Sequence, residues 1–335
     1  MKKLVLPLIF CVLPIAADAL EHNYDNWIFK LSGYGTAGYV ISDDRSDLAN
    51  DWQVRGQMTY RKSKDLLFGV AISHNAWGTD QDKPFMDAFV YTESPWGRME
   101  LGGTDTIAAK LGLGLPDVGG LRINNDSIIY DFADPSPMLS RGTISGAQFA
   151  FRANAVSAPG PIQAGFSFAP KQHHFNSASD FGLKYKKSGG KTKLALSLGA
   201  SFIDKPENFT GDIYAARANA DWRGQVSAGL NLQYNSWIWG LNAKTTYDKN
   251  PIGSISDGIS VGTGISYDFL KWSVSSSYML SQIGIFHDNE DYFAHTGIIS
   301  LRYKINSFWN IWTSGGVVSS DKTSPFISAG VMIKF

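Results

Sequence analysis

Apolar and polar residues alternate along most of this chain from Trp27 onward, and turn residues interrupt the alternation at short intervals. In residues 51–62 the apolar side chains occupy even positions and the polar ones odd positions. A period of two predicts β-strands, because successive side chains of a strand point to opposite faces. The pattern predicts sixteen strands, over residues 27–42, 51–62, 65–77, 84–93, 97–104, 143–155, 161–170, 179–187, 192–203, 225–235, 237–249, 258–270, 271–284, 294–306, 308–320 and 326–335.

The connections between these strands alternate between short and long. Seven are short turns, such as Ser94-Pro95-Trp96. Eight are longer, at residues 43–50, 78–83, 105–142, 171–178, 204–224, 250–257, 285–293 and 321–325. Bacterial outer-membrane barrels have an even number of antiparallel strands, short periplasmic turns and longer external loops. The sequence therefore predicts an all-β fold, a sixteen-stranded antiparallel transmembrane β-barrel over residues 20–335 with both ends on the periplasmic side.

Alternation alone does not show which face of the sheet contacts water, since a soluble sandwich or barrel would bury the apolar side chains in its interior. The order of the loops favours a lipid-facing apolar exterior and a polar interior. No stretch after residue 20 is apolar for 18 residues, so a membrane-spanning helix is not expected. Aromatic residues cluster beside the short turns, as at Trp237, Trp239 and Trp272, which is typical of a girdle at the membrane interface.

The first nineteen residues have the pattern of a secretory signal peptide. Lys2 and Lys3 precede an apolar run, and Ala17-Asp18-Ala19 forms a small-residue cleavage site. We therefore predict export through a cleaved signal peptide (residues 1–19) to the outer membrane of a Gram-negative bacterium. Cys11 is the only cysteine, and it lies inside this segment, so the mature chain would contain no disulfide and no catalytic thiol.

Charge and motifs exclude several other classes of protein. The chain carries 30 basic and 30 acidic residues, which argues against nucleic-acid binding. The glycines between Gly33 and Gly38 match a dinucleotide fingerprint, but they lie within a predicted strand and open no helix. Neither a hydrolytic triad nor a convincing metal-ligand spacing is present, so we predict no enzyme activity, no metal site and no cofactor.

The segment 105–142 is too long for an ordinary hairpin loop, and loops of this length are usually functional or disordered. It mixes apolar residues, such as Leu111 and Leu113, with several aspartates. A loop exposed to water would not need this apolar content, whereas a loop folded onto the inner wall would. We expect it to fold into the lumen and to set a limit on solute size and charge.

Three patches of sequence carry a family resemblance. Leu115-Pro116-Asp117-Val118-Gly119-Gly120 resembles the Pro-Glu-aromatic-Gly-Gly signature in the third loop of the general trimeric porins of Gram-negative bacteria. Residues 29–35 resemble the first strand of that family, and Phe335 its C-terminal aromatic residue. The chain differs from the signature at Asp117, where Glu is more usual, and at Val118, which replaces an aromatic residue. The resemblance implies a homotrimer and passive diffusion.

In the family that this chain resembles, acidic residues of the third loop face basic residues of the wall across a narrow eyelet. The resemblance implies an eyelet formed by Asp105, Asp117 and Asp126 on the loop, with Arg55 and Arg98 on the wall. Alternation predicts that further charged residues point inward and line the pore: Arg61, Arg152, Lys184, Lys193, Lys244, Arg302, Asp87 and Glu100. The alternative for some of them is local pairing on one strand face, as between Arg98 and Glu100.

These observations predict an outer-membrane porin for small hydrophilic solutes and ions, surrounded by lipid and lipopolysaccharide and without a nucleic-acid partner. Three alternatives share some of the evidence. A substrate-specific channel of the same fold would favour a row of inward aromatic residues, and only Tyr34, Phe89 and Tyr91 fit. A barrel enzyme would need a hydrolytic constellation, and a structural or adhesive barrel would not conduct ions.

Overall fold

The computed structural model describes residues 20–42, 46–79, 85–119, 151–172, 176–204, 221–249, 255–285, 290–319 and 323–335. The predicted signal peptide therefore lies outside the described residues. The strands are β1 (Leu20–Tyr24), β2 (Trp27–Ser42), β3 (Ser46–Ser63), β4 (Leu66–Thr79), β5 (Phe85–Ser94), β6 (Gly97–Gly103), β7 (Phe151–Ser157), β8 (Ile162–Ala169), β9 (Ser177–Gly189), β10 (Thr192–Asp204), β11 (Trp222–Tyr234), β12 (Trp237–Lys249), β13 (Ile255–Phe269), β14 (Trp272–Ile285), β15 (Glu290–Lys304), β16 (Trp309–Ser319) and β17 (Thr323–Lys334). One short helix, α2 (Ile107–Leu111), is also described.

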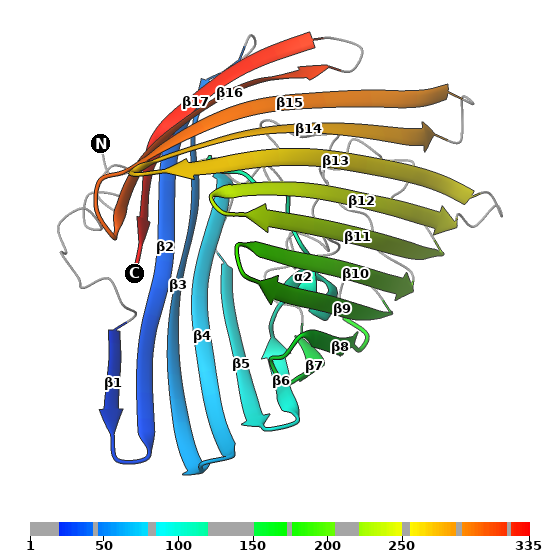
Figure 1. The fold of residues 1–335 in the computed structure, drawn as a ribbon. Coiled ribbons are helices and arrows are strands. Elements are labelled where there is room, and N and C mark those ends of the chain that lie inside the picture. The colour runs from blue at the N-terminus through cyan, green and yellow to red at the C-terminus, as the bar shows by residue number, and fades with distance from the viewer. Residues whose placement is uncertain are drawn as a thin grey trace.

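Strands β2 to β17 form a closed antiparallel barrel, which confirms the predicted fold. Each strand pairs with its neighbour in sequence, and β17 pairs with β2 to close the ring. Figure 1 shows the strands curving around a central space in which α2 lies behind β9 and β10. Closure removes the free sheet edges, which is the condition for a sheet to span a membrane.

A seventeenth strand, β1, was not predicted. It pairs with the first part of β2, from Trp27↔Tyr24 to Leu31↔Leu20. Strand β17 covers the same edge of β2 further along and ends where Phe335 meets Gly33. Figure 1 shows β1 beside the lower part of β2, below the C-terminus. The hairpin therefore covers a stretch of β2 that β17 does not reach.

The two faces of the barrel differ as predicted. The large apolar side chains that are exposed lie on the outer face, including Leu198 (53% exposed), Val226 (50%) and Ile299 (64%). Alternate residues of the same strands, such as Ser197 and Ser227, are polar and buried on the inner face. Among the described residues, helices long and apolar enough to cross a membrane are absent.

Outward aromatic side chains gather at the barrel end that carries the short turns. Trp237 and Tyr267 lie with ring centroids 4.3 Å apart, and Trp272 and Tyr303 lie 4.6 Å apart. Trp96, in the turn between β5 and β6, is 89% exposed. Amphipathic rings are favoured at the membrane–water interface, so this band agrees with the predicted aromatic girdle.

Most of the predicted longer loops are partly strand in the structure, and β3 and β13 give two examples. Strand β3 begins at Ser46 although residues 43–50 were predicted to be a loop, and β13 begins at Ile255 within the predicted loop 250–257. Cross-strand hydrogen bonding extends hairpins beyond the point where the local sequence stops alternating. The short turns remain short, with only residues 64–65 between β3 and β4.

The glycines near the start of β2 lie at the seam that closes the barrel. The Gly33 N–H donates to the Phe335 carbonyl at 2.8 Å, and the Phe335 N–H donates to the Gly33 carbonyl at 2.9 Å. A Cβ at Gly33 would lie 2.5 Å from the Gln53 carbonyl oxygen and 2.8 Å from the Phe335 ring. A Cβ at Gly38 would similarly overlap the Trp312 ring. Close strand approach therefore accounts for the glycines that resemble a dinucleotide motif.

We expect Gly33→Ala to destabilise the barrel by about 1–3 kcal/mol, because the added methyl group overpacks the seam. The measurement is the fraction of protein that keeps the electrophoretic mobility of the folded barrel as the unboiled sample is warmed. Gly56→Ala is the matched control, since a Cβ at this β3 position meets no atom within 4 Å. Equal melting of the two variants would show that the seam does not need glycine.

Candidate functional site

The long connection after β6 begins with a single helical turn. Thr106 caps α2, because its hydroxyl accepts a hydrogen bond from the Ala109 N–H at 3.1 Å. Ile107, Ala108 and Leu111 are buried and share one face of the turn. This apolar face packs against β8, β9 and β10. The apolar residues of the segment thus hold it against the inner wall, as the sequence predicts for this part of the loop.

A buried ion pair anchors the helix. The Asp180 carboxylate on β9 accepts a hydrogen bond from the Ala108 N–H at 2.8 Å and lies 3.8 Å from the Arg152 guanidinium on β7. The side chains of Arg152 and Asp180 are only 1% and 4% exposed. Arg152 faces inward but lies beneath the start of the loop, so its charge serves this anchor and does not face open water.

From Leu113 to Gly119 the segment runs along the inner wall from one strand to the next. Its main chain bonds to side chains of β10, β11, β12 and β14. These bonds join Leu113 N to Ser197 Oγ (3.2 Å), Leu113 O to Asn242 Nδ2 (2.7 Å), Gly114 O to Asn231 Nδ2 (3.3 Å) and Val118 N to Ser275 Oγ (3.0 Å). The barrel thus satisfies four backbone polar groups of a segment that has no secondary structure of its own.

The wall beneath the loop is built from glycines where the chains approach most closely. A Cβ at Gly165 would lie 2.8 Å from Ile107, and one at Gly262 would lie 2.8 Å from Leu115. Gly229 and Gly240 are similarly close to Leu113 and Pro116. These inward glycines leave space in which the loop lies against the wall, and larger side chains at these positions would occupy that space. Leu115 also packs on the buried cluster Met279, Ile298 and Phe326.

A cluster of charges surrounds Glu100 at the start of the loop. Arg98 Nε donates to Glu100 Oε1 at 2.9 Å, and Lys110 pairs with the other carboxylate oxygen. Thr104 and Asn154 donate to that second oxygen at 2.9 and 3.1 Å. Glu100 is only 8% exposed, so its charge is compensated where it lies. The local pairing of Arg98 with Glu100 that the sequence allowed is present.

Three cations surround one aromatic ring on the inner wall. Arg55 Cζ, Arg98 Cζ and Lys110 Nζ lie 5.9, 5.8 and 5.6 Å from the centroid of Phe89. Arg98 Cζ also lies 3.9 Å from the centroid of Tyr91. Burial lowers the pKa of the Lys110 ammonium, and the Glu100 carboxylate opposes this effect. Cation–π contact and the paired carboxylate hold this basic group together.

The predicted acidic residues of the loop lie at different places on the wall. The Asp105 carbonyl accepts a hydrogen bond from Asn154 on β7, and its carboxylate lies close enough to Lys110 and Arg152 to interact with their charges. The Asp117 carboxylate accepts hydrogen bonds from Ser275 Oγ on β14 and from the Gly119 N–H, each at 3.0 Å. Asp126 lies outside the described residues.

The other residues predicted to line the pore lie on the inner face at various depths. Arg61 and Lys193 are exposed near the short turns, Lys184, Lys244 and Arg302 are half-buried, and Asp87 is buried with Ser73 Oγ 3.5 Å from its carboxylate. Two members of the site, Lys110 and Asp180, were not predicted from the sequence. Asp180 lies four residues before the predicted inward residue Lys184 on the same strand, so alternation could have identified its inward direction. Nothing in the alternation of strands could place Lys110, which lies on a helix.

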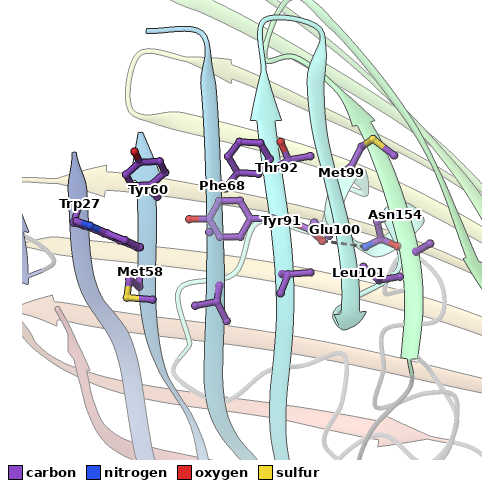
Figure 2. A pocket seen from close by; sticks show the side chains of 14 residues that line it. Trp27, Met58, Tyr60, Phe68, Tyr91, Thr92, Met99, Glu100, Leu101 and Asn154 are labelled. Carbon is purple, nitrogen blue, oxygen red and sulfur yellow. Dashed lines mark hydrogen bonds between the residues drawn. The ribbon is translucent and has the colours of Figure 1, made fainter. Parts of the chain in front are cut away.

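A hollow of about 610 Å³ lies on the outer side of β2 to β7. Its lining includes the outward side chains Met58, Tyr60, Phe68, Met99 and Leu101, which Figure 2 shows ranged across the strands. The outward lining is mostly apolar, and Tyr91, Glu100 and Asn154 of the inner face also border the hollow. Within the described residues we find no group of three or more His, Cys, Asp and Glu side chains that could hold a metal ion.

Residues 25–304 match the sequence pattern of the Gram-negative porin family. A search of curated proteins found no match. The fold is similar to that of OmpT, an outer membrane protein of Vibrio cholerae, in a form lacking loop L8, with a TM-score of 0.69 and 10% identity over 93% of this chain and 100% of that one.

Two further structures are similar in fold. OmpF of Salmonella typhi, in complex with daunomycin, gives a TM-score of 0.67 at 13% identity and covers 94% of this chain and 100% of its own. An anion-selective porin from Comamonas acidovorans gives 0.63 at 12% identity, over 92% of this chain and 100% of its own. At this level of identity the structures establish the fold alone.

We expect Gly240→Val to push the segment around Pro116 off the wall, because the new side chain would occupy the space of the proline ring. In single-channel recordings the displaced loop should lower the mean current and add fluctuations within the open state. Gly297→Val on the outer face is the control, since a Cβ there meets no atom within 4 Å. Unchanged current in both variants would contradict the placement of the loop against the inward glycines of the wall.

Removing one partner of the buried anchor should be costly. We expect Asp180→Ala to destabilise the protein by about 3–5 kcal/mol, because it leaves the Arg152 charge buried and unpaired. The measurement is the midpoint of thermal unfolding in detergent. The double variant Arg152→Met/Asp180→Leu should recover most of the loss, since it removes both charges and keeps the volume. Failure of the double variant to recover would assign the loss to the missing Ala108 hydrogen bond.

Proposed function

The chain belongs to the Gram-negative porin family, and from this premise we propose that its lumen selects solutes at an eyelet formed by the loop and the inner wall. The protein is an outer-membrane porin, a channel for passive diffusion. The observation that carries the proposal is the course of residues 104–119 along the inner face, secured by wall hydrogen bonds from β10 to β14. A fixed loop inside a barrel narrows the lumen and so limits solute size.

The proposed eyelet has a basic side and an acidic side. Arg55, Arg98 and Lys110 gather around Phe89 and form the basic side. Asp117 is held toward β14, and Asp105 lies nearer the basic group. Asp126 is proposed as a further acidic member on the strength of the family resemblance. Arg55 is the strongest candidate for contact with permeating ions, since it has no carboxylate partner among the described residues.

A substrate-specific channel is less well supported. The inward aromatic residues Phe89 and Tyr91 are only 5% and 6% exposed, because cationic side chains and the loop cover them. Such rings cannot serve as an accessible slide for sugars. The family and the fold point to a channel, and we further propose that the protein catalyses no reaction and needs no cofactor.

The surroundings of the channel are proposed on the same basis. We infer export through the signal peptide at residues 1–19, and contact with lipid and lipopolysaccharide around the apolar outer face. A homotrimer is supported by the resemblance and by the apolar hollow on β2 to β7, which offers a surface for another copy. The Vibrio cholerae OmpT structure described as a trimer form has this fold.

The decisive test of the eyelet is the reversal potential of single channels in a planar bilayer under a salt gradient. We expect Arg55→Glu to shift the selectivity toward cations, because it exchanges a positive charge of the basic side for a negative one. Lys64→Glu is the matched control, since Lys64 is exposed in the turn between β3 and β4. An equal shift in the control, or none in Arg55→Glu, would remove Arg55 from the eyelet.

A further inference from the structure

Besides Lys30, Arg61 and Arg98 on β2, β3 and β6, six basic residues lie on the inner face of the barrel toward the short turns. We refer to them as the basic mouth: Lys184, Lys186, Lys193, Arg302, Lys304 and Lys334. Lys184 and Lys186 lie on β9, Lys193 on β10, Arg302 and Lys304 on β15, and Lys334 on β17. The barrel therefore carries basic residues on two separate sectors of the wall at the same end.

The inward direction of these residues follows from the burial of each strand. On β9 the inner positions are Ala178, Asp180 and Gly182, which are buried, so Lys184 and Lys186 continue the same row. On β10 the buried row at Ser197 and Ser201 extends back to Lys193, because residues two apart share a face. The same rule places Arg302 and Lys304 in line with Thr296 and Ser300, and Lys334 in line with Ser328 and Met332.

The cross-strand neighbours of the basic mouth are neutral. Lys184 lies opposite Gln163 and Ser197, and Lys193 lies opposite Gln233 and Ser188. Arg302 lies opposite Ser273 and Trp312, Lys304 opposite Asn310, and Lys334 opposite Tyr34. The charges on Lys184 and Lys186 repel one another, as do those on Lys334 and Arg302. Within the described residues, only Arg302 of these six has a carboxylate at ion-pair distance, Asp268 at 4.0 Å, so most of the positive charge at this end is not compensated locally.

Inward carboxylates at this end are fewer than the basic residues. Among the described residues they include Glu93, Asp268 and Glu21, the last opposite Lys30 at the start of β2. Glu93 lies 3.8 Å from Arg98, and Asp268 lies 4.0 Å from Arg302. Neither Glu93 nor Asp268 forms an ion pair with any of the five lysines of the basic mouth. The mouth therefore differs from the cluster around Glu100, where a carboxylate bonds to two cations directly.

We propose that the basic mouth is a second selectivity element, which concentrates small anions such as chloride, phosphate and organic carboxylates at the short-turn end and makes this porin anion-selective. This rests on the proposed function as a diffusion channel. Charges lining a low-dielectric opening raise the local concentration of counter-ions, and the effect weakens with salt. In porin topology this end opens into the periplasm. The mouth therefore acts on ions that have passed, or are about to enter, the eyelet.

The β9–β10 hairpin offers a matched experiment. Lys184→Gln/Lys186→Gln removes two inward charges, whereas Lys187→Gln/Lys191→Gln removes two charges from the outward face and the turn of the same hairpin. The measurement is the chloride-to-potassium permeability ratio from the reversal potential in a KCl gradient. We expect a ratio above one in the original protein, a decrease of about two-fold in the inward variant at low salt, and no change in the outward variant.

Lys334→Gln tests the opposite sector, with the exposed turn residue Lys271→Gln as its control. Selectivity should also fade as salt rises from about 0.1 M to 1 M, because the Debye length shortens from about 10 Å to about 3 Å. Equal ratios in the inward and outward variants, or a cation-selective original protein, would overturn the basic mouth while leaving the porin intact. A folded protein that conducts no current would instead overturn the proposed function and this inference with it.

Discussion

The structure depends on hydrogen bonding between the first and last strands of the barrel. Inside a membrane an unpaired backbone group has no water to bond with, so a sheet must close completely. Strand β17 pairs with β2, and Gly33 and Phe335 exchange two hydrogen bonds where that pairing ends. The edge of β2 beyond this point is occupied by β1. Without closure there would be neither an apolar exterior nor a separate interior for the loop.

The closed wall in turn determines where the long loop can lie. Barrel strands usually present side chains to the lumen, and such side chains would keep a second layer of chain at a distance. Here inward glycines such as Gly165 and Gly262 allow the loop to lie directly on the backbone of the wall. Between them, Ser197 and Asn242 bond to the polar groups of the loop. The glycines let the loop approach the backbone of the wall, and the polar side chains form hydrogen bonds to it. Together they hold in place a segment that has almost no secondary structure of its own.

Much of the fold could be predicted because two strong regularities act along the whole chain. Alternation identifies the strands, and the sorting of loops by length identifies the topology. Strand β1 escaped prediction because five residues, Leu20–Tyr24, are too few to show a period, and it forms only because β2 leaves an edge uncovered. The limits of β3 and β13 were misplaced because pairing with a neighbouring strand, and not the local pattern, decides where a hairpin ends.

The site was less predictable, since its geometry comes from contacts between distant segments. Alternation placed Arg55, Arg98 and Glu100 on the inner face, but it could not show that Phe89 gathers the cations. Arg152 also faces inward, but its inward direction does not reveal that the loop covers the residue. Lys110 belongs to the site through a helical turn whose orientation is set by Asp180 on another strand.

Net charge is a poor guide to selectivity in such a protein. The chain as a whole is neutral, with 30 basic and 30 acidic residues. A permeating ion responds only to charges that face the lumen and lack a partner, since a paired charge has little field at a distance. Around Glu100 the charges compensate one another, whereas the lysines near the short turns lie opposite neutral residues. Alternation along a strand determines on which face of the barrel a charge lies, and its place along the strand determines the nearer end of the barrel. A chain with no net charge can therefore form a channel whose lumen carries a strong local charge.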